Sequence, residues 1–343
     1  MTSKLIEKPV TINLALQGGG SHGAFTWGVL DRLLEEENLK IEGVSGVSAG
    51  AMNALMLAQG LLEGGNQGAR DKLDKYWDKV GIKLPSVTDV PKLFKDIGNF
   101  FGNTFSEKFG GGKLDLFNAI SEIELNPLQM IVDELVDFEL IQKYSKLKIF
   151  VGATHVRTGK LKLFTNKELT IDALMASACL PSVVQQGVEI DGELYWDGGY
   201  SANPAIYPLV YDCDCKDTVT VLLHPLERND VPNNSAEIME RIAELGFSST
   251  FLREMRAITI AKKRIKKNRL LDMFETRLSE SRFHFVYAER LMNELSVSSK
   301  MNNMGVFLHM LKDHGRARAE SFLQESGNKI GVESSVDLKD LFC

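Results

Sequence analysis

Short apolar runs alternate with amphipathic stretches along the N-terminal part of the chain. The run Thr11–Leu16 leads directly into the glycines Gly18–Gly20, and apolar residues then recur at helical spacing between Ala24 and Asn38. A second apolar run, Ile41–Val44, is followed by the Ala- and Met-rich stretch Ala49–Leu62. The order strand, turn, helix, strand, turn, helix predicts the start of an α/β fold.

The same alternation continues further along the chain. Four more strands are expected at 147–153, 161–164, 194–196 and 218–223, with a helix at 170–179. Such alternation is typical of a three-layer α/β/α fold, in which helices cover both faces of a mostly parallel sheet. Functional groups then gather outside the carboxyl ends of the strands.

The composition shifts after Pro225, where long helical patterns dominate. Helices are expected at 236–271 and 307–324, with one further strand at 282–288. The chain therefore ends in a mainly helical C-terminal extension. Eight Lys and Arg residues lie between Arg253 and Arg269, opposite an apolar stripe. A basic amphipathic helix of this kind either makes a peripheral contact with an anionic membrane surface or is simply a solvated helix.

Charge and hydropathy limit the classes of partner. The 40 Lys and Arg against 46 Asp and Glu give a net charge of −6, which argues against nucleic-acid binding. No apolar run approaches the ~20 residues that span a bilayer. Residues Met1–Pro9 lack the apolar core of a secretory signal, so the sequence predicts a cytoplasmic protein, soluble or peripheral to a membrane, with a non-Sec export route left open.

A nucleophile motif lies between the second strand and the second helix. The sequence Gly46-Val47-Ser48-Ala49-Gly50 fits G-x-S-x-G in the strand–turn–helix context that this pattern requires. The glycines Gly46 and Gly50 remove Cβ atoms that would strike the neighbouring strand and helix. The motif predicts Ser48 as a nucleophile at a helix N-terminus.

The loop after the first strand offers backbone donors. Its sequence is Gly18-Gly19-Gly20-Ser21-His22-Gly23, and consecutive glycines before a helix expose N–H groups that suit an oxyanion or a phosphate. The same letters fit the Gly-x-Gly-x-x-Gly of a nucleotide-binding module. That alternative lacks its acidic residue, because Val44, Ser45 and Gly46 fill the end of the next strand.

A serine nucleophile needs a base, and two residues after strands are candidates. Asp197 follows the strand 194–196 and precedes Gly198 and Gly199, which permit a tight supporting turn. His224 follows the strand 218–223 and would complete a Ser48, Asp197, His224 triad. His22, within the glycine loop, is a candidate substrate contact.

These motifs, in this order, resemble the patatin-like phospholipases. The likeness extends to Gly28-Val29-Leu30, Ser177–Pro181 and Asn203-Pro204-Ala205, and it covers about Ile12 to Tyr211. It implies a catalytic domain at 12–211 and an extension at 212–343. The segment 84–113, rich in phenylalanine, proline and glycine, would be a lid-like insertion or a plain surface excursion.

The resemblance also implies a chemistry. Ser48 would be the nucleophile and Asp197 its base without histidine, with Gly18, Gly19, Gly20 and Gly23 forming the oxyanion hole and with no metal or cofactor. Members often carry Arg or Lys where this chain has His22. An ordinary carboxyl with a pKa near ~4 is a poor base, so Asp197 should be desolvated. The implied substrate is an acyl ester of a phospholipid or glycerolipid, and a catalytically silent lipid-binding protein is the alternative.

Overall fold

The computed structural model describes residues 5–81, 127–181, 187–229, 231–268, 270, 273 and 275–343. The insertion expected at 84–113 lies outside these residues. No helix in the described ranges combines the length and hydrophobicity that crossing a bilayer requires.

A single sheet forms the centre of the described structure. Its strands follow the order β5-β6-β3-β2-β1-β7-β8, and β4 pairs with β3 beside this path. The pairs among β1, β2, β3, β7 and β8 are parallel, whereas β4, β5 and β6 run antiparallel to their neighbours. The strands are β1 (Val10–Leu16), β2 (Leu39–Gly46), β3 (Lys148–His155), β4 (Leu161–Thr165), β5 (Val188–Ile190), β6 (Glu193–Asp197), β7 (Asp217–Val221) and β8 (Arg282–Val286).

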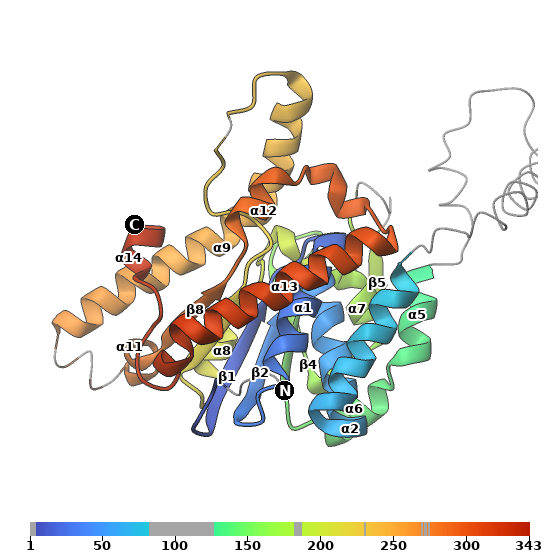
Figure 1. The fold of residues 1–343 in the computed structure, drawn as a ribbon. Coiled ribbons are helices and arrows are strands. Elements are labelled where there is room, and N and C mark those ends of the chain that lie inside the picture. The colour runs from blue at the N-terminus through green and yellow to red at the C-terminus, as the bar shows by residue number, and fades with distance from the viewer. Residues whose placement is uncertain are drawn as a thin grey trace, which may run out of the picture.

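Helices cover both faces of this sheet and enclose two hydrophobic cores (Figure 1). One core lies beneath α1 (Gly23–Leu33), α2 (Ala49–Val80), α5 (Pro127–Leu135), α6 (Phe138–Tyr144), α7 (Ile171–Ser177), α12 (Glu289–Glu294) and α13 (Gly305–Ser326). The other lies beneath α8 (Tyr207–Tyr211), α9 (Ser235–Lys267), α11 (Thr276–Glu280) and α14 (Leu338–Phe342). The predicted three-layer α/β/α fold with a mostly parallel sheet and a largely helical C-terminal part is confirmed.

Several boundaries differ from those that the sequence pattern indicates. Helix α2 runs on to Val80, past a break at Gly64 and Gly65 where the backbone leaves helical angles. The strand β5 was not predicted, because three residues before a turn give no period to detect. The C-terminal part also contributes β7 and β8 to the sheet, which places it within the fold rather than beside it.

Helix α13 is fixed on α1 by a close approach of the two backbones. A Cβ atom at Gly28 would lie 1.9 Å from the carbonyl oxygen of Lys312, and one at Gly315 would lie 2.1 Å from that of Phe25. Only glycine fits at such contacts, so these two residues set the distance between the helices. The last long helix of the chain is thereby joined to the first.

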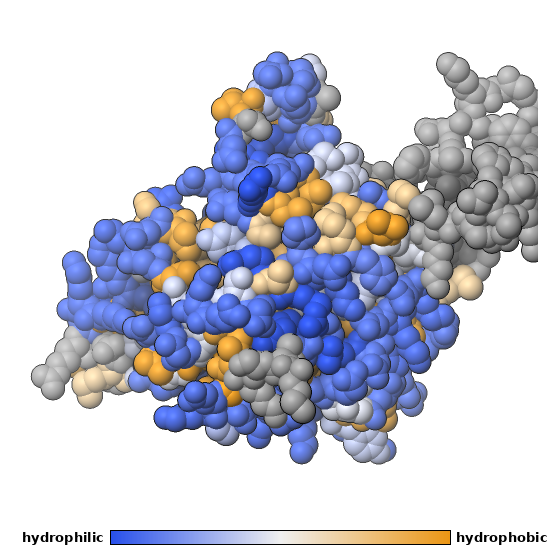
Figure 2. Space-filling view, in the orientation of Figure 1, coloured by the Kyte–Doolittle hydropathy of each residue, from blue (hydrophilic) through white to orange (hydrophobic). Residues whose placement is uncertain are grey.

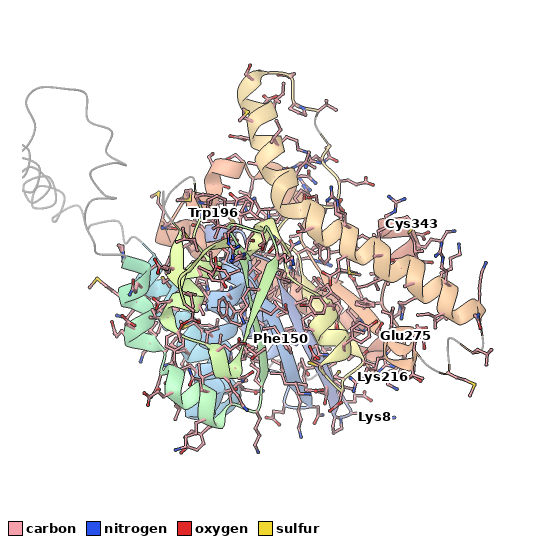
Figure 3. The ribbon with its side chains drawn as sticks, turned by 180° about the vertical axis from the view of Figure 1, so that it is seen from behind. Lys8, Phe150, Trp196, Lys216, Glu275 and Cys343 are labelled. Carbon is pink, nitrogen blue, oxygen red and sulfur yellow. The ribbon has the colours of Figure 1, made fainter. Side chains whose placement is uncertain are left out.

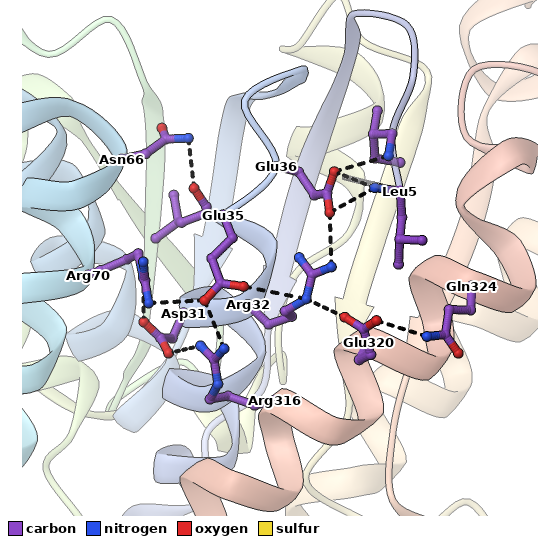
Figure 4. A network of polar contacts seen from close by, with 12 residues as sticks. Leu5, Asp31, Arg32, Glu35, Glu36, Asn66, Arg70, Arg316, Glu320 and Gln324 are labelled. Carbon is purple, nitrogen blue, oxygen red and sulfur yellow. Dashed lines mark hydrogen bonds and ion pairs between the residues drawn. The ribbon is translucent and has the colours of Figure 1, made fainter. Parts of the chain in front are cut away.

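A network of charged side chains lines the same helix contact (Figure 4). Asp31 of α1 pairs with Arg70 at 2.7 Å and with Arg316, and Glu35 accepts from both arginines at 3.1 and 2.8 Å. Nearby, Arg32 is 2% exposed and pairs with Glu36 and Glu320 at 2.9 and 2.5 Å. A buried ion such as Arg32 is tolerated only when paired, so its position depends on its partners on both sides of the α1–α13 contact.

Alanine at two helical glycines separates close packing from helix propensity. In an exposed helix, Gly→Ala stabilises by up to about 1 kcal/mol, and at Gly246 in α9 the new Cβ would meet open space. At Gly315 it would overlap the Phe25 carbonyl, so Gly315→Ala should destabilise by about 1–3 kcal/mol. Denaturant unfolding of both variants checks the pair; equal stabilisation would contradict the described contact.

Candidate active site

The parallel strands bring three chain segments to one edge of the sheet. Leu16, the last residue of β1, pairs with Gly46 at the end of β2 and with Val221 at the end of β7. The glycine loop, the serine turn and His224 follow these three strands. They therefore meet at the carboxyl edge, which is where α/β sheets place functional groups.

Asp197 reaches this edge by a different route from the one that the sequence pattern suggested. Strand β6 is antiparallel to β3, so its end would normally lie at the opposite edge. However, β6 pairs only with the last residues of β3. Asp197 lies opposite Ala153, which follows Val151, the partner of Gly46 at the end of β2. Asp197 therefore lies at the carboxyl edge of the parallel strands. Figure 3 places Trp196 at the upper end of the sheet, away from Lys8 and Lys216.

Ser48 occupies a strained turn. Its φ of 53° and ψ of −127° lie in a region that residues with a Cβ seldom adopt, and its N–H donates to the carbonyl of Ser177 at 3.0 Å. A Cβ at Gly46 would lie 2.6 Å from the carbonyl oxygen of Gly50, and one at Gly50 would lie 2.2 Å from that of Leu16. The two flanking glycines therefore allow the sharp turn that holds Ser48.

Asp197 is fully buried, and its carboxyl group has few hydrogen-bond partners among the described residues. Its Oδ1 accepts the N–H of Gly199 at 2.7 Å, and its Oδ2 has no hydrogen-bond partner among the described residues. Burial raises the pKa of Asp197 to about 7, against smaller lowering effects of the Gly199 amide and the Ser48 hydroxyl. Among the described residues, no cation contributes to the shift. The Ser48 hydroxyl is thus close enough to this carboxyl to lower its pKa.

The supporting turn after Asp197 is fixed by its two glycines. A Cβ at Gly198 would lie 2.2 Å from the carbonyl oxygen of Gly152 and 2.7 Å from a methyl group of Val47. A Cβ at Gly199 would lie 2.2 Å from the ring of Phe247. These contacts hold the turn of Asp197 against the residue that precedes Ser48.

Two of the four loop glycines are committed to bonds within the protein. The N–H of Gly18 donates to Asn203 Oδ1 at 2.7 Å, and that of Gly23 donates to carbonyls of the preceding turn. Gly19 and Gly20 line a cavity beside Ser48. The family resemblance implied all four as oxyanion-hole residues, and Gly19 and Gly20 are the two that line the cavity.

Gln17 and Asn203 brace the loop, and neither was identified from the sequence as part of the site. Gln17 donates to the carbonyl of Asn203 at 3.1 Å and accepts the N–H groups of Leu223 and His224 at 2.7 and 3.1 Å. Both side chains are buried. The Asn203-Pro204-Ala205 segment was noted in the sequence, but the sequence does not indicate that Asn203 binds the glycine loop.

The two candidate histidines are buried and uncharged. His22 Nε2 lies 2.7 Å from Ser299 Oγ, and His22 is not among the described residues that line the cavity, so the structure does not place it as a substrate contact. His224 does line the cavity, with Nε2 3.2 Å from the carbonyl of Gly18 and Nδ1 3.3 Å from Lys300 Nζ. Burial, followed by the charge of Lys300, lowers the pKa of each to about 3.

The cavity that unites these residues has a volume of about 400 Å³. Such a volume suits a small organic ligand or part of a lipid. Its lining combines the motif residues Gly19, Gly20, Ser48 and Asp197 with residues that carry no motif: Leu180, Tyr200, His224, Ala243, Glu244, Phe247, Ser298, Lys300 and Met301. Helix α9 and the 3₁₀ turn η4 (Val297–Met301) thus bring the C-terminal part to the site.

Among the described residues, no group of three or more His, Cys, Asp or Glu side chains is placed to hold a metal ion. The residues that line the cavity include a serine at a strained turn, an aspartate with a desolvated carboxyl group and two glycines. Such groups can carry out proton transfer and nucleophilic attack on a carbonyl.

Comparison with known proteins gives one family match. The model of the patatin-like phospholipase family matches residues 14–210. Comparison with curated sequences gave no significant match.

Comparison with solved structures gave distant neighbours. VipD from Legionella pneumophila aligns with a TM-score of 0.37 and 15% identity, over 92% of this chain and 67% of that chain. The ExoU–SpcU complex from the type III secretion system of Pseudomonas aeruginosa aligns with a TM-score of 0.32 and 15% identity. That alignment covers 92% of this chain and 52% of the other, so the chain spans about half the length of this neighbour.

Proposed function

Because the chain belongs to the patatin-like phospholipase family, we propose that it is a serine acyl hydrolase that cleaves acyl esters of phospholipids or glycerolipids. One observation carries this proposal: Ser48 and Asp197, far apart in the chain, line one cavity, and the pKa of Asp197 is raised to about 7. A carboxyl group with such a pKa is a competent base near neutral pH.

The proposed reaction has two halves. In the first, Ser48 Oγ attacks the ester carbonyl carbon while Asp197 takes the hydroxyl proton, and the resulting oxyanion accepts N–H groups from Gly19 and Gly20. The carbon–oxygen ester bond then breaks, and Asp197 returns the proton to the departing alcohol. In the second half, Asp197 takes a proton from water, which attacks the acyl-serine, and the proton passes to Ser48 Oγ as the fatty acid leaves.

The contacts of His224 favour this dyad over a triad. Its Nε2 faces the Gly18 carbonyl and its Nδ1 faces Lys300, so both ring nitrogens have partners other than Ser48 and Asp197. A pKa lowered to about 3 also makes it a weak base. We assign His224 the role of holding the glycine loop in position.

The packing of the glycine loop also weighs against a nucleotide-binding module. A Cβ at Gly18 would lie 2.9 Å from Ser48 Cβ, so the loop is packed against the serine turn. Glu42, the acid on β2, accepts hydrogen bonds from the N–H groups of Asp214 and Cys215 and pairs with Lys148. These partners occupy the carboxylate that a ribose would need.

In this proposal residues 12–211 form the catalytic domain and residues 212–343 complete it. The extension supplies β7 and β8 to the sheet, packs α13 on α1 and contributes Glu244 and Lys300 to the cavity.

Three substitutions test the assignment of roles. Ser48→Ala and Asp197→Asn should each lower fatty-acid release by at least about a thousandfold, because both act on the same reacting atoms. His224→Gln keeps a hydrogen-bond donor for the Gly18 carbonyl and should lower fatty-acid release by less than about tenfold. Loss of a general base would lower the rate by about a hundredfold or more. Mass spectrometry of the products from a lipid panel measures all three.

A fluorophosphonate probe tests the nucleophile and separates the alternatives. It should label the wild type and His224→Gln at Ser48 and should not label Ser48→Ala. A wild type that binds lipid vesicles but is not labelled at Ser48 and releases no fatty acid would indicate a catalytically silent lipid-binding protein. Loss of activity in His224→Gln as complete as in Ser48→Ala would replace the dyad with a triad.

A peripheral contact with a lipid surface accompanies this function in our proposal. The N-terminal part of α9 stands out above the sheet in Figure 1, and hydrophobic residues gather over η4 and the start of α13 in Figure 2. Met301, Met304 and Val306 are 57%, 42% and 71% exposed. Exposed basic residues of α9 would add attraction to anionic lipid.

The basic contribution can be tested at exposed lysines of α9. Lys262 is unsuitable, because its Nζ donates to the carbonyls of Leu278, Ser279 and Ser281. Lys263 and Lys266 are exposed. In a Ser48→Ala background, Lys263→Glu with Lys266→Glu should weaken vesicle binding by at least about tenfold, since each cation near an anionic surface contributes about 1 kcal/mol.

Co-sedimentation with phosphatidylserine vesicles at low and high salt measures this effect. Phosphatidylcholine vesicles serve as the uncharged control. Unchanged binding of the double variant to the anionic vesicles would remove the basic helix from the proposed contact.

A further inference from the structure

The turn η4 places a lysine in the cavity and packs it against the glycine loop. The carbonyl oxygen of Lys300 would lie 2.4 Å from a Cβ at Gly20, and its own Cβ would lie 3.5 Å away. Gly20 also has a φ of +57°, which glycine adopts without strain. The backbone that carries Lys300 is therefore fixed against one of the two glycines that face the cavity.

The Lys300 side chain has no carboxylate partner within ion-pair distance among the described residues. Its Nζ lies 3.3 Å from Nδ1 of His224, a neutral ring. Burial lowers the pKa of Lys300 to about 8, with Glu244 raising it and Arg228 lowering it. The ammonium group thus remains mostly protonated at neutral pH, in a cavity that is otherwise largely apolar.

The acid whose charge acts on Lys300 is already paired with other cations. Glu244, which is 3% exposed, pairs with Arg228 and Arg241, each at 2.7 Å. His22 and His224 carry no charge at neutral pH, and Asp197 is about half ionised there. Lys300 is consequently the one cation among the described residues that line the cavity. A partly buried cation that lacks an ion-pair partner becomes more favourable when a ligand supplies the opposite charge.

We propose that Lys300 forms an anion subsite that binds the phosphate group of a phospholipid substrate beside Ser48. This inference rests on the proposed function, and it adds a residue outside the matched segment 14–210 together with a preference for phosphate-bearing lipids over neutral glycerolipids. The ammonium donates to a phosphate oxygen, and this contact positions the glycerol ester near Ser48 Oγ. Lys300 is then a specificity residue.

Binding measured without turnover tests the subsite independently of hydrolysis. In the Ser48→Ala background, calorimetry compares dihexanoylphosphatidylcholine with dihexanoylglycerol, which has the same acyl esters and no phosphate. Lys300→Met should weaken binding of the phospholipid by about 10- to 100-fold, the range for a charge-assisted hydrogen bond, and change binding of the diacylglycerol less than about threefold. Lys300→Arg should restore most of the phospholipid binding.

Lys216→Met is the matched control, because Lys216 lies at the opposite end of the sheet in Figure 3 and pairs with Glu280. It removes the same charge and should leave both affinities unchanged. An equal loss for both lipids in Lys300→Met would show that Lys300 only supports His224 and the loop, which overturns the subsite. No loss for either lipid overturns it as well.

Hydrolysis by the wild-type protein separates the two proposals. If the phospholipid is bound through Lys300 but not cleaved, the acyl hydrolase fails while the subsite stands. If the wild type cleaves the lipids and Lys300→Met keeps the same preference for the phospholipid, the hydrolase stands and the subsite fails.

Discussion

A carboxyl group buried without a cation is the constraint on which this site depends. Asp197 has no solvent exposure, and within the part of the chain that the structure describes only the Gly199 amide donates a hydrogen bond to its Oδ1. In water or beside an arginine, the same group would be ionised and a weak base. Its raised pKa therefore follows from how tightly the surrounding backbone excludes water, and the close contacts of Gly198 and Gly199 provide that exclusion.

Keeping such a group in place requires support from distant parts of the chain. Gln17 and Asn203 tie the glycine loop to the end of β7, and the Ser177 carbonyl and hydroxyl hold the amide of Ser48. Helix α13 joins the C-terminal part to α1 through Gly28 and Gly315. The C-terminal elements α9 and η4 then form the outer wall of the cavity, so the extension contributes both to stability and to the site.

The sequence was sufficient for the parts of the site that are local. The fold class and the strands that lead to Ser48 and the glycine loop follow from periodicity and glycine spacing, because these features lie within a few residues of each other. Asp197 was found at the correct edge for an incorrect reason, since the antiparallel direction of β6 is set by pairing across the sheet. Glu244, Phe247 and Lys300 could not be found, because no local pattern marks a residue that reaches the cavity from a separate element.

The pH dependence of hydrolysis tests the central claim most directly. With His22 and His224 both shifted to a pKa of about 3, Asp197 is the group of the proposed machinery that titrates near neutrality. The account predicts that kcat/KM on a neutral short-chain ester rises with pH through a midpoint of about 7, as Asp197 loses its proton. A profile already flat above pH ~5, as an ordinary carboxyl with a pKa near ~4 would give, would contradict it.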